Sequence, residues 1–556
     1  MIRGAGTPSR GGDRLRGRLV AAASAVLLLL VSPGGAPGGE PQALERETVA
    51  RADAASAASP CNPFGNEVWA GNGAAPPPVG APVPAAVLLA PSDLAPRKRA
   101  WEESVGGRRI ARALIHARLA GWPDRLHVDP AELPQDETAF LQRVARDTWR
   151  GLDALRDRDS GLPLDHVRFS GSTLDLSSAQ IGDYASVSSL GLYLASLVAA
   201  RELGFLSADE AVARVRQLLA TLGKLESHRG IYFNFYDTTS LERTSHFLSF
   251  VDSAWLTAGL MVVRSSFPEL HEEATRLIVQ RNYGFFYDAP IQQMSHGYYV
   301  DRGERSLYHY ATLYTEARLG SLIAIGKGDV PEEHWYRMAR TFPPECTWQS
   351  QPPKGRREKE VNGHTVIGGW YEWKGLRYVP SWGGSMFEAL MPTLFLDERA
   401  LAPRSLGRNG EVHVEVQRRF AREDLGHSVW GMSPAAAPEP DGYREYGVKP
   451  LGMRGYEDAA VTPHAVALAL PFAPSEAIRT LRELAEKYRV YGEYGFYDSV
   501  NPNTGEVGTV YLALDQGMLL LALANHLTGG VIQQRFAADP IAAKALSLLA
   551  DEDFFD

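Results

Sequence analysis

Apolar residues recur at helical spacing along most of the chain. Phe140, Leu141, Val144, Trp149 and Leu152 share one face of a predicted helix, because residues three and four positions apart are neighbours on a helix surface. The same spacing predicts further helices over residues 190–203, 212–225, 252–263, 475–489 and 511–527, and less clearly over 305–326 and 413–424. The dense part of the chain is therefore predicted to be mainly helical.

The segments between these helices are long and often aromatic. Ser207 and Glu210 have the spacing of a capping box at a helix start, and Gly230 then opens an aromatic loop over residues 231–237. Residues 347–380 are predicted to form a long loop or a small inserted hairpin. Helix hairpins joined by long loops favour a ring of paired helices around a central cleft, although an open helical solenoid has the same periodicity.

The N-terminal region has the order of a secretory signal. Five arginines between Arg3 and Arg18 precede an apolar run over residues 19–31, and small residues and proline follow. We therefore expect export to the periplasm or medium, with an uncleaved signal anchor as the alternative. The predicted units are a signal peptide at 1–35, a disordered Ala/Pro/Gly-rich linker at 36–100, a lead-in helix at 101–136, a folded domain at 137–545 and an acidic tail at 546–556.

Composition excludes some classes of partner and leaves others open. The net charge of −9 gives no electrostatic case for binding nucleic acid or an anionic membrane. Aromatic residues make up 10% of the chain, a mild indication of a sugar-binding cleft. Metal-ligand spacings such as CxxC and HExxH do not occur, and neither do nucleotide-binding loops, so we expect no metal and no cofactor. Whether the two cysteines, Cys61 and Cys346, pair is left open.

A single carboxylate, Glu388, lies in the apolar and aromatic segment 381–392. Burial disfavours the charged form of a carboxylate and raises its pKa, which is how enzymes prepare a general acid. The alternative is a Glu that caps the start of a helix. From this segment alone both interpretations remain open.

Other carboxylates lie at loop–helix junctions beside aromatic residues, namely Asp237, Asp252, Glu316, Asp458 and Asp515. Each one alone is well explained by a helix cap or an ion pair. Together they predict a cleft with several acids, which is typical of glycoside hydrolysis by paired carboxylates.

An ordered series of segments resembles a known family. It includes residues 188–194, 236–242, 250–253, 315–319, 324–331, 384–388, 441–447, 494–498 and 514–517. The series resembles the glycoamylase-like family, in particular the middle catalytic region of cyclic β-1,2-glucan synthases and the endo-β-1,2-glucanases of glycoside hydrolase family 144. The resemblance implies an all-α fold, an (α/α)6 barrel, and an exported glycosidase acting on β-1,2-glucan or a related polysaccharide.

The resemblance also implies roles for individual residues. Glu388 matches the general acid, Asp458 is the first candidate for the second carboxylate, and Asp515 is the next. Contacts to the sugar are expected from Tyr184, Asp237, Asp252, Glu316, Trp382, Tyr443, Arg444 and Tyr497. Retaining and inverting mechanisms both remain open.

One position departs from the synthase pattern. The synthases carry a Glu after Trp-Gly-Ile-Ser, whereas here Trp430-Gly431-Met432-Ser433 is followed by Pro434. This departure favours a non-catalytic glycan-binding envelope protein as one alternative. A transglycosylase on the same scaffold is the other. In all three cases the expected partner is a polysaccharide or oligosaccharide.

Overall fold

The computed structural model describes residues 114–170, 174, 178–306, 308–438, 442–550 and 552–556. The predicted signal peptide, the linker, Cys61 and residues 101–113 of the predicted lead-in helix lie outside these residues. For the described residues 114–136 the predicted lead-in helix is wrong beyond its first turns: only residues 114–118 are helical, and a single 3-10 turn follows at Pro130–Glu132. Pro123, Pro130 and Pro134 interrupt this segment, and proline cannot continue a helix.

One set of helices is buried on nearly all sides. It comprises α5 (Val187–Glu202), α7 (Phe250–Ser266), α9 (Ala317–Lys327), α11 (Met386–Leu390), α14 (Pro463–Leu468) and α16 (Ala513–Thr528). A helix that is apolar all round belongs in an interior. Accordingly, α5 packs against α7 and α16, α7 also packs against α9, and α14 lies between α16 and α11.

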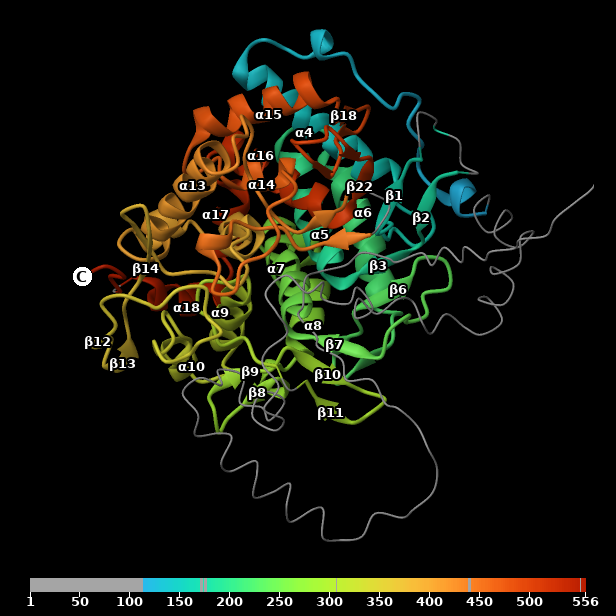
Figure 1. Cartoon of the computed structure of the whole chain (residues 1–556). Coiled ribbons are helices and arrows are strands. Elements are labelled where there is room, and N and C mark those ends of the chain that lie inside the picture. The colour runs from blue at the N-terminus through green and yellow to red at the C-terminus, as the bar shows by residue number, and fades with distance from the viewer. Residues whose placement is uncertain (1–113, 171–173, 175–177, 307, 439–441, 551) are drawn as a thin grey trace, which may run out of the picture.

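A second set of helices is mainly buried on one face and covers the first. It comprises α4 (Glu137–Ala154), α6 (Ala208–Leu222), α8 (His271–Val279), α13 (Leu406–Glu423) and α15 (Pro474–Tyr488). Here α4 packs on α16, α6 on α5, α8 on α7, α13 on α11 and α15 on α14. Figure 1 shows α13 and α15 toward the outside and α5 and α7 near the centre. Most of the helices predicted from apolar spacing are confirmed, as is the Ser207 capping box. The helix predicted over 305–326 is correct only from Ala317 onward, because strand β11 (Glu304–Arg305) and a loop precede it.

Short strands precede several of the buried helices. Strand β3 (Tyr184–Ser186) runs directly into α5, β7 (Phe247–Ser249) into α7, and β22 (Val510–Leu512) into α16. Each is paired antiparallel with another short strand: β3 with β6 (Phe235–Asp237), β7 with β10 (Gly297–Tyr299), and β22 with β1 (His166–Arg168). This pairing fixes the loops at the N-terminal ends of these three helices.

The predicted insertion at 347–380 forms two hairpins. They are β12 (Glu358–Val361) with β13 (His364–Ile367), and β14 (Tyr371–Trp373) with β15 (Leu376–Tyr378). The remaining helices are α10 (Glu333–Arg337), α12 (Glu398–Leu401), α17 (Val531–Ala537) and α18 (Pro540–Ala545). Among the described residues, none of the helices combines the length and the apolar character that a bilayer span requires.

A buried ion pair joins the predicted folded domain to the C-terminal segment 546–556. Arg340 donates hydrogen bonds to Glu552 at 2.9 and 2.6 Å, and both side chains are buried.

Cys346 is buried and disulfide-bonded. Cys61, the only other cysteine in the sequence, lies outside the described residues.

Candidate active site

Carboxylates gather at the N-terminal ends of the buried helices. Asp252, Glu388 and Asp515 lie in the first turns of α7, α11 and α16, and Glu316 is the N-cap residue of α9. The first backbone N–H groups of a helix have no partner within the helix, and the helix dipole is positive at this end. Negative charge in these positions is therefore partly compensated despite burial.

Glu388 is both a helix cap and a buried acid. Its carboxylate accepts hydrogen bonds from the Ser381 hydroxyl at 2.9 Å, the Gly383 N–H at 3.0 Å and the Ser385 N–H at 3.2 Å. Ser385 in turn completes a capping box with it. Burial raises the pKa of Glu388, while these hydrogen bonds lower it by stabilising the charged form. Both sequence interpretations of this residue therefore describe part of its environment.

Two further glutamates interact electrostatically with Glu388. Burial and the charge of Glu388 raise the pKa of Glu316 to about 8. The same two causes raise the pKa of Glu445, whose side chain is half-buried, to about 7. Carboxylates that share a site cannot all ionise easily, so this group of three holds protons near neutral pH.

Two tyrosines border this group of acids. The pKa of Tyr456 is raised well above its usual value by burial and by the charges of Glu388, Glu445 and Glu316. Burial and the charges of Glu316 and Asp252 raise the pKa of Tyr310 in the same way. Both phenols are therefore neutral hydrogen-bonding groups beside the carboxylates.

Glycines allow the backbone to close around Glu388. A Cβ atom at Gly383 would lie 2.0 Å from the Tyr456 ring, and one at Gly384 would lie 2.1 Å from the Val448 carbonyl oxygen. The Val448 N–H donates to the Gly384 carbonyl at 2.9 Å. The capping loop of Glu388 is thus packed directly against the segment that follows Glu445.

A second buried group lies around Asp515. Donor atoms of His464, Asp498 and Asp515 lie within 4.8 Å of one another. Burial and Asp498 raise the pKa of Asp515 well above its usual value, and burial raises that of Asp498 to about 7. Burial lowers the pKa of His464 to about 3, so its imidazole is neutral.

These three residues have the donor set of a cation site, with one imidazole and two carboxylates. Sequence spacing did not predict this set, because its members come from separate parts of the chain. Without a cation, the two carboxyls would share protons. Tyr443 lies beside this group, since burial and the charges of Asp515 and Asp498 raise its pKa. Burial and the charge of Asp165 raise the pKa of Tyr184.

Some predicted site residues have structural roles. Asp237 accepts the N–H groups of Thr239 and Ser240 and so stabilises a turn. The Tyr497 hydroxyl donates to the Leu126 carbonyl at 2.6 Å. These hydrogen bonds are sufficient to explain the positions of the Asp237 and Tyr497 side chains.

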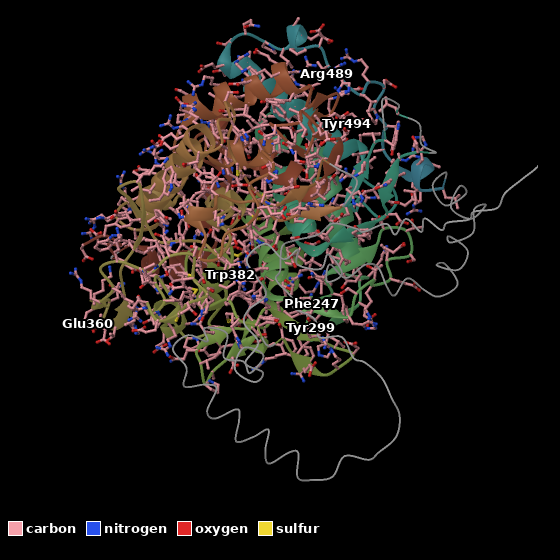
Figure 2. All side chains as sticks on the ribbon, viewed as in Figure 1. Phe247, Tyr299, Glu360, Trp382, Arg489 and Tyr494 are labelled. Atoms are coloured by element: carbon pink, nitrogen blue, oxygen red, sulfur yellow. The ribbon has the colours of Figure 1, made fainter. Side chains whose placement is uncertain are left out.

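The remaining predicted site residues are more accessible. Asp458 is half-buried, and Arg444 is exposed with Glu457 3.8 Å away. Trp382 is half-buried and packs against Trp348 with ring centres 5.8 Å apart. Figure 2 shows Trp382 in the same lower part of the molecule as Phe247 and Tyr299, whose rings pair at 4.8 Å.

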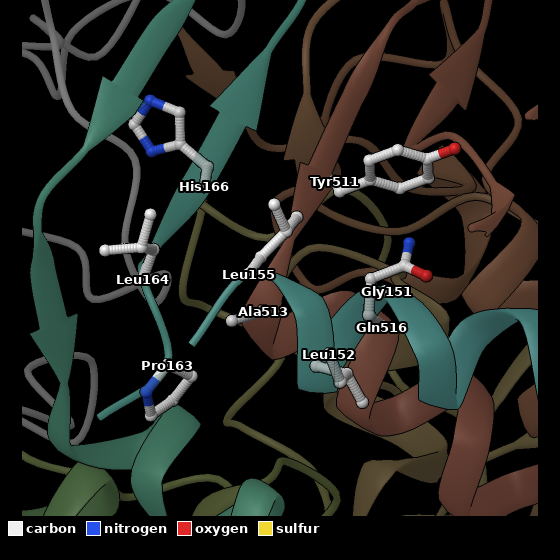
Figure 3. A pocket seen from close by; sticks show the side chains of 9 residues that line it. All are labelled: Gly151, Leu152, Leu155, Pro163, Leu164, His166, Tyr511, Ala513 and Gln516. Atoms are coloured by element: carbon white, nitrogen blue, oxygen red, sulfur yellow. The ribbon is translucent and has the colours of Figure 1, made fainter. Parts of the chain in front are cut away.

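A small pocket is lined in part by α16, the helix that carries Asp515. Figure 3 shows Ala513 and Gln516 of α16 facing Leu152, Leu155, Pro163 and Leu164 across it, with His166 and Tyr511 at its rim. The walls are mainly apolar, and none of the carboxylates described above lines it. We therefore regard this pocket as a gap in packing between α4, α16 and β1.

Sequence reasoning missed Glu445, Tyr456, His464 and Asp498 as site residues. Glu445 and Asp498 both lie inside segments that carry the family resemblance, 441–447 and 494–498. A carboxylate in each segment was the available signal. Neither segment has the surrounding apolar run that drew attention to Glu388.

Comparison with known proteins identifies the type of scaffold. Residues 308–540 match the Glycoamylase family model, described as "Putative glucoamylase", and residues 143–322 match DUF3131, a family of unknown function. The resemblance to the glycoamylase-like family is confirmed.

Two curated relatives are distant in sequence. The chain is 23% identical to the cyclic β-(1,2)-glucan synthase NdvB of Rhizobium meliloti, over 76% of this chain and 19% of that protein. It is 20% identical to an exo β-1,2-glucooligosaccharide sophorohydrolase of Parabacteroides distasonis, over 66% of this chain and 53% of that protein. The chain thus spans about a fifth of the first relative and about half of the second.

The solved structure of the endo-β-1,2-glucanase from Chitinophaga pinensis has a similar fold. Its TM-score is 0.58 at 15% identity, with 75% of this chain and 99% of that chain covered. At this identity the likeness concerns the fold alone. The predicted glycoamylase-like scaffold therefore agrees with a solved structure over nearly the whole length of the latter.

Proposed function

We propose that this protein is an exported glycoside hydrolase that cleaves β-1,2-glucan or a closely related polysaccharide. The observation that carries the proposal is the group formed by Glu316, Glu388 and Glu445, in which burial raises the pKa values of all three carboxyls and the charge of Glu388 raises those of Glu316 and Glu445 further. Paired carboxyls with different protonation states are the general requirement for cleaving a glycosidic bond. The glucan-active relatives supply the substrate class.

We further propose that the six buried helices form a closed (α/α)6 barrel. Packing joins α9, α7, α5, α16, α14 and α11 in that order. Arg318 of α9 supports the remaining contact, because its guanidinium donates to the Glu388 and Ala389 carbonyls of α11 at 3.2 and 2.6 Å. This ring brings the first turns of the helices, and hence the carboxylates, to one end of the barrel.

Export is part of the same proposal. The order of arginines, apolar run and small residues at the N-terminus is that of a secretory signal. The disulfide-bonded state of Cys346 supports this, because disulfides persist in oxidising compartments outside the cytosol. Secretion would place the enzyme where polysaccharides are accessible.

Product analysis tests the function directly. Mature protein, residues 40–556, is incubated with linear β-1,2-glucan, and the products are separated by chromatography beside a Glu388→Gln control. We expect short oligosaccharides from the parent and a rate at least about 100-fold lower from the variant, since one acid–base group contributes about 10²–10⁴-fold. Longer or cyclic products would indicate a transglycosylase instead. A folded parent protein that binds glucan without converting it would contradict the hydrolase proposal.

A further inference from the structure

Three buried side chains from separate elements converge at the start of α16. His464 belongs to the first turn of α14, Asp515 belongs to the first turn of α16, and Asp498 directly precedes β20 (Ser499–Val500). One donor atom of each lies within 4.8 Å of the other two, and none of the three residues is more than 2% exposed. Charge on these side chains must therefore be balanced from within the protein rather than by bulk water.

The two carboxylates of this group have few hydrogen-bond donors. With both side chains ionised, neither oxygen of Asp515 accepts a hydrogen bond from any described residue, and Asp498 Oδ1 accepts none either. Asp498 Oδ2 accepts the Ala436 N–H at 2.6 Å. The charge of Arg168 lowers the pKa of Asp498, but burial outweighs this effect and raises it. Because buried carboxylate oxygens without partners are costly, either shared protons or a cation must balance the group.

The distance between His464 and Asp515 suits two ligands of one metal ion. His464 Nδ1 lies 3.5 Å from Asp515 Oδ2, which is longer than the range of about 2.7–3.2 Å for an N–H···O hydrogen bond. Ligand atoms of a tetrahedral zinc ion lie about 3.4 Å apart, because each is about 2.0–2.1 Å from the metal. The observed separation therefore needs little adjustment for both atoms to bind the same ion.

The state of the imidazole is also suitable for a ligand. Burial lowers the pKa of His464 to about 3, so the ring is neutral, as metal binding requires. Its Nε2 atom lies 3.5 Å from the Thr462 hydroxyl oxygen. When Nε2 carries the ring proton on this side, the Nδ1 lone pair remains available on the side of Asp515.

A buried hydroxyl beside the group lacks a partner as well. The Tyr443 side chain is buried, and its hydroxyl makes no hydrogen bond to any residue in the described part of the chain. The charges of Asp515 and Asp498 both raise the pKa of Tyr443, so its hydroxyl lies within electrostatic range of the two carboxylates. This hydroxyl is placed to hydrogen-bond a water molecule that completes the coordination of an ion.

From this geometry we propose that His464, Asp498 and Asp515 bind a divalent transition-metal ion of the zinc type, through one imidazole nitrogen and two carboxylate oxygens. Imidazole favours zinc and similar ions, whereas Mg²⁺ and Ca²⁺ prefer oxygen ligands alone. The ion balances the buried carboxylates and joins α14, α16 and the segment before β20. Since α14 packs against α11, the ion also supports the helix that carries Glu388.

Metal analysis and thermal unfolding of the purified full-length protein test this inference. Protein treated with EDTA and then freed of it is titrated with ZnCl₂, MgCl₂ or CaCl₂, without reductant so that Cys346 stays disulfide-bonded. After dialysis we expect about one Zn²⁺ per chain by plasma mass spectrometry. The melting temperature should rise by roughly 3 °C at a free Zn²⁺ concentration about 100-fold above Kd. The same concentrations of Mg²⁺ and Ca²⁺ should change it by less than about 1 °C.

Two variants distinguish this site from binding elsewhere on the protein. Asp515→Asn and His464→Gln each remove a proposed ligand and should weaken Zn²⁺ binding at least about 100-fold, because losing a group that merely supports a ligand costs about 10–100-fold. His413→Gln is the matched control, since His413 is also buried with its pKa lowered to about 3 but is not part of the group. Relative to its own metal-free form, this variant should keep the full rise in melting temperature.

The Asp515→Asn variant should fold, because asparagine has nearly the same shape and removes a buried charge. In EDTA its melting temperature should equal or exceed that of the metal-free parent. A parent that retains no Zn²⁺ and shows no rise in melting temperature would overturn the inference and indicate carboxyls that share protons. A Zn²⁺ response that persists in both ligand variants would overturn it in favour of another binding site. Neither result depends on glucan hydrolysis, so the proposed function is tested separately.

Discussion

Glu388 shows how much the state of one residue depends on its immediate contacts. Burial alone would favour the neutral acid, as the apolar sequence around it suggests. Its hydrogen bonds from Ser381, Gly383 and Ser385 oppose that effect and favour the carboxylate. The capping-box spacing Ser385-x-x-Glu388 was readable in the sequence, whereas the contribution of Ser381 depends on the fold of the preceding loop.

Replacing Ser381 tests this balance. The Ser381→Ala variant loses a hydrogen bond to a buried carboxylate, so we expect the free energy of unfolding to fall by about 1.5–3 kcal/mol. The pKa of Glu388 should rise, and the acid side of the kcat/KM profile should move to higher pH. Urea denaturation and the pH–rate profile measure the two effects.

Thr365→Ala is the matched control for the loss of a hydroxyl, because Thr365 is exposed and bonds only to Glu360 at 2.7 Å among the contacts described. Its free energy of unfolding should change by no more than about 0.5 kcal/mol. Equal losses in the two variants would contradict a special role for the Ser381 hydroxyl.

At the scale of elements, the crossing of α5 and α7 depends on two glycines. A Cβ atom at Gly259 would lie 2.1 Å from the Gly191 carbonyl oxygen, and one at Gly191 would lie 2.2 Å from the Trp255 carbonyl oxygen. The two helix backbones therefore touch, with no room for a side chain at either position. Glycine inside a helix costs about 1 kcal/mol relative to alanine, so the close approach must more than compensate for that cost.

The Gly259→Ala variant should lower the free energy of unfolding by about 3 kcal/mol or more, because a rigid backbone cannot yield to the added methyl group as a side chain would. Gly223→Ala, at the end of α6, is the control: its Cβ atom would lie 3.5 Å from the Ala220 carbonyl oxygen, an ordinary contact. Chemical denaturation followed by circular dichroism measures both variants. A Gly259→Ala variant as stable as the parent would contradict the close crossing.

For the whole molecule, buried titratable groups determine how stability depends on pH. Burial raises the pKa values of Glu316, Glu445 and Asp498 to about 8, 7 and 7. The native state therefore binds protons at neutral pH that the unfolded chain has released, and stability falls as pH rises. Burial lowers the pKa values of His296, His413 and His464 to about 3 and that of His334 to about 4. These histidines have the opposite effect on stability. Below pH 6.5 their side chains bind more protons in the unfolded chain than in the native state, so their contribution to stability increases as pH rises.

We therefore expect the effects of the carboxyls and of the histidines on the free energy of unfolding to cancel partly between pH 4 and 6.5. Above pH 6.5, only the carboxyls should change this free energy. The free energy of unfolding should decrease from pH 6.5 to 8. The Glu316→Gln variant removes the carboxyl with the highest of the three pKa values, so its free energy of unfolding should decrease less over this interval. Denaturant titrations at several pH values measure this slope, and a parent protein that gains stability over the interval would contradict the assignment.

The sequence by itself determined most of the helical segments, the Ser207 capping box, the glycoamylase-like resemblance and the position of Glu388 at a helix start. These features depend on residues close together in the chain, where apolar period, capping spacing and local motifs have direct physical consequences. The sequence also placed Asp252 at a helix start, where the structure confirms it.

Only the tertiary structure decided which acids interact. The folded chain brought Glu316 and Glu445 within electrostatic range of Glu388, and packing brought together His464, Asp498 and Asp515 from separate helices and loops. Hydrogen bonds in the folded chain likewise explain the position of Asp237 in a turn and that of the Tyr497 hydroxyl against the Leu126 carbonyl. Local pattern determines where a helix begins, but the protonation state of a carboxylate depends on burial and on charges that the folded chain brings beside it.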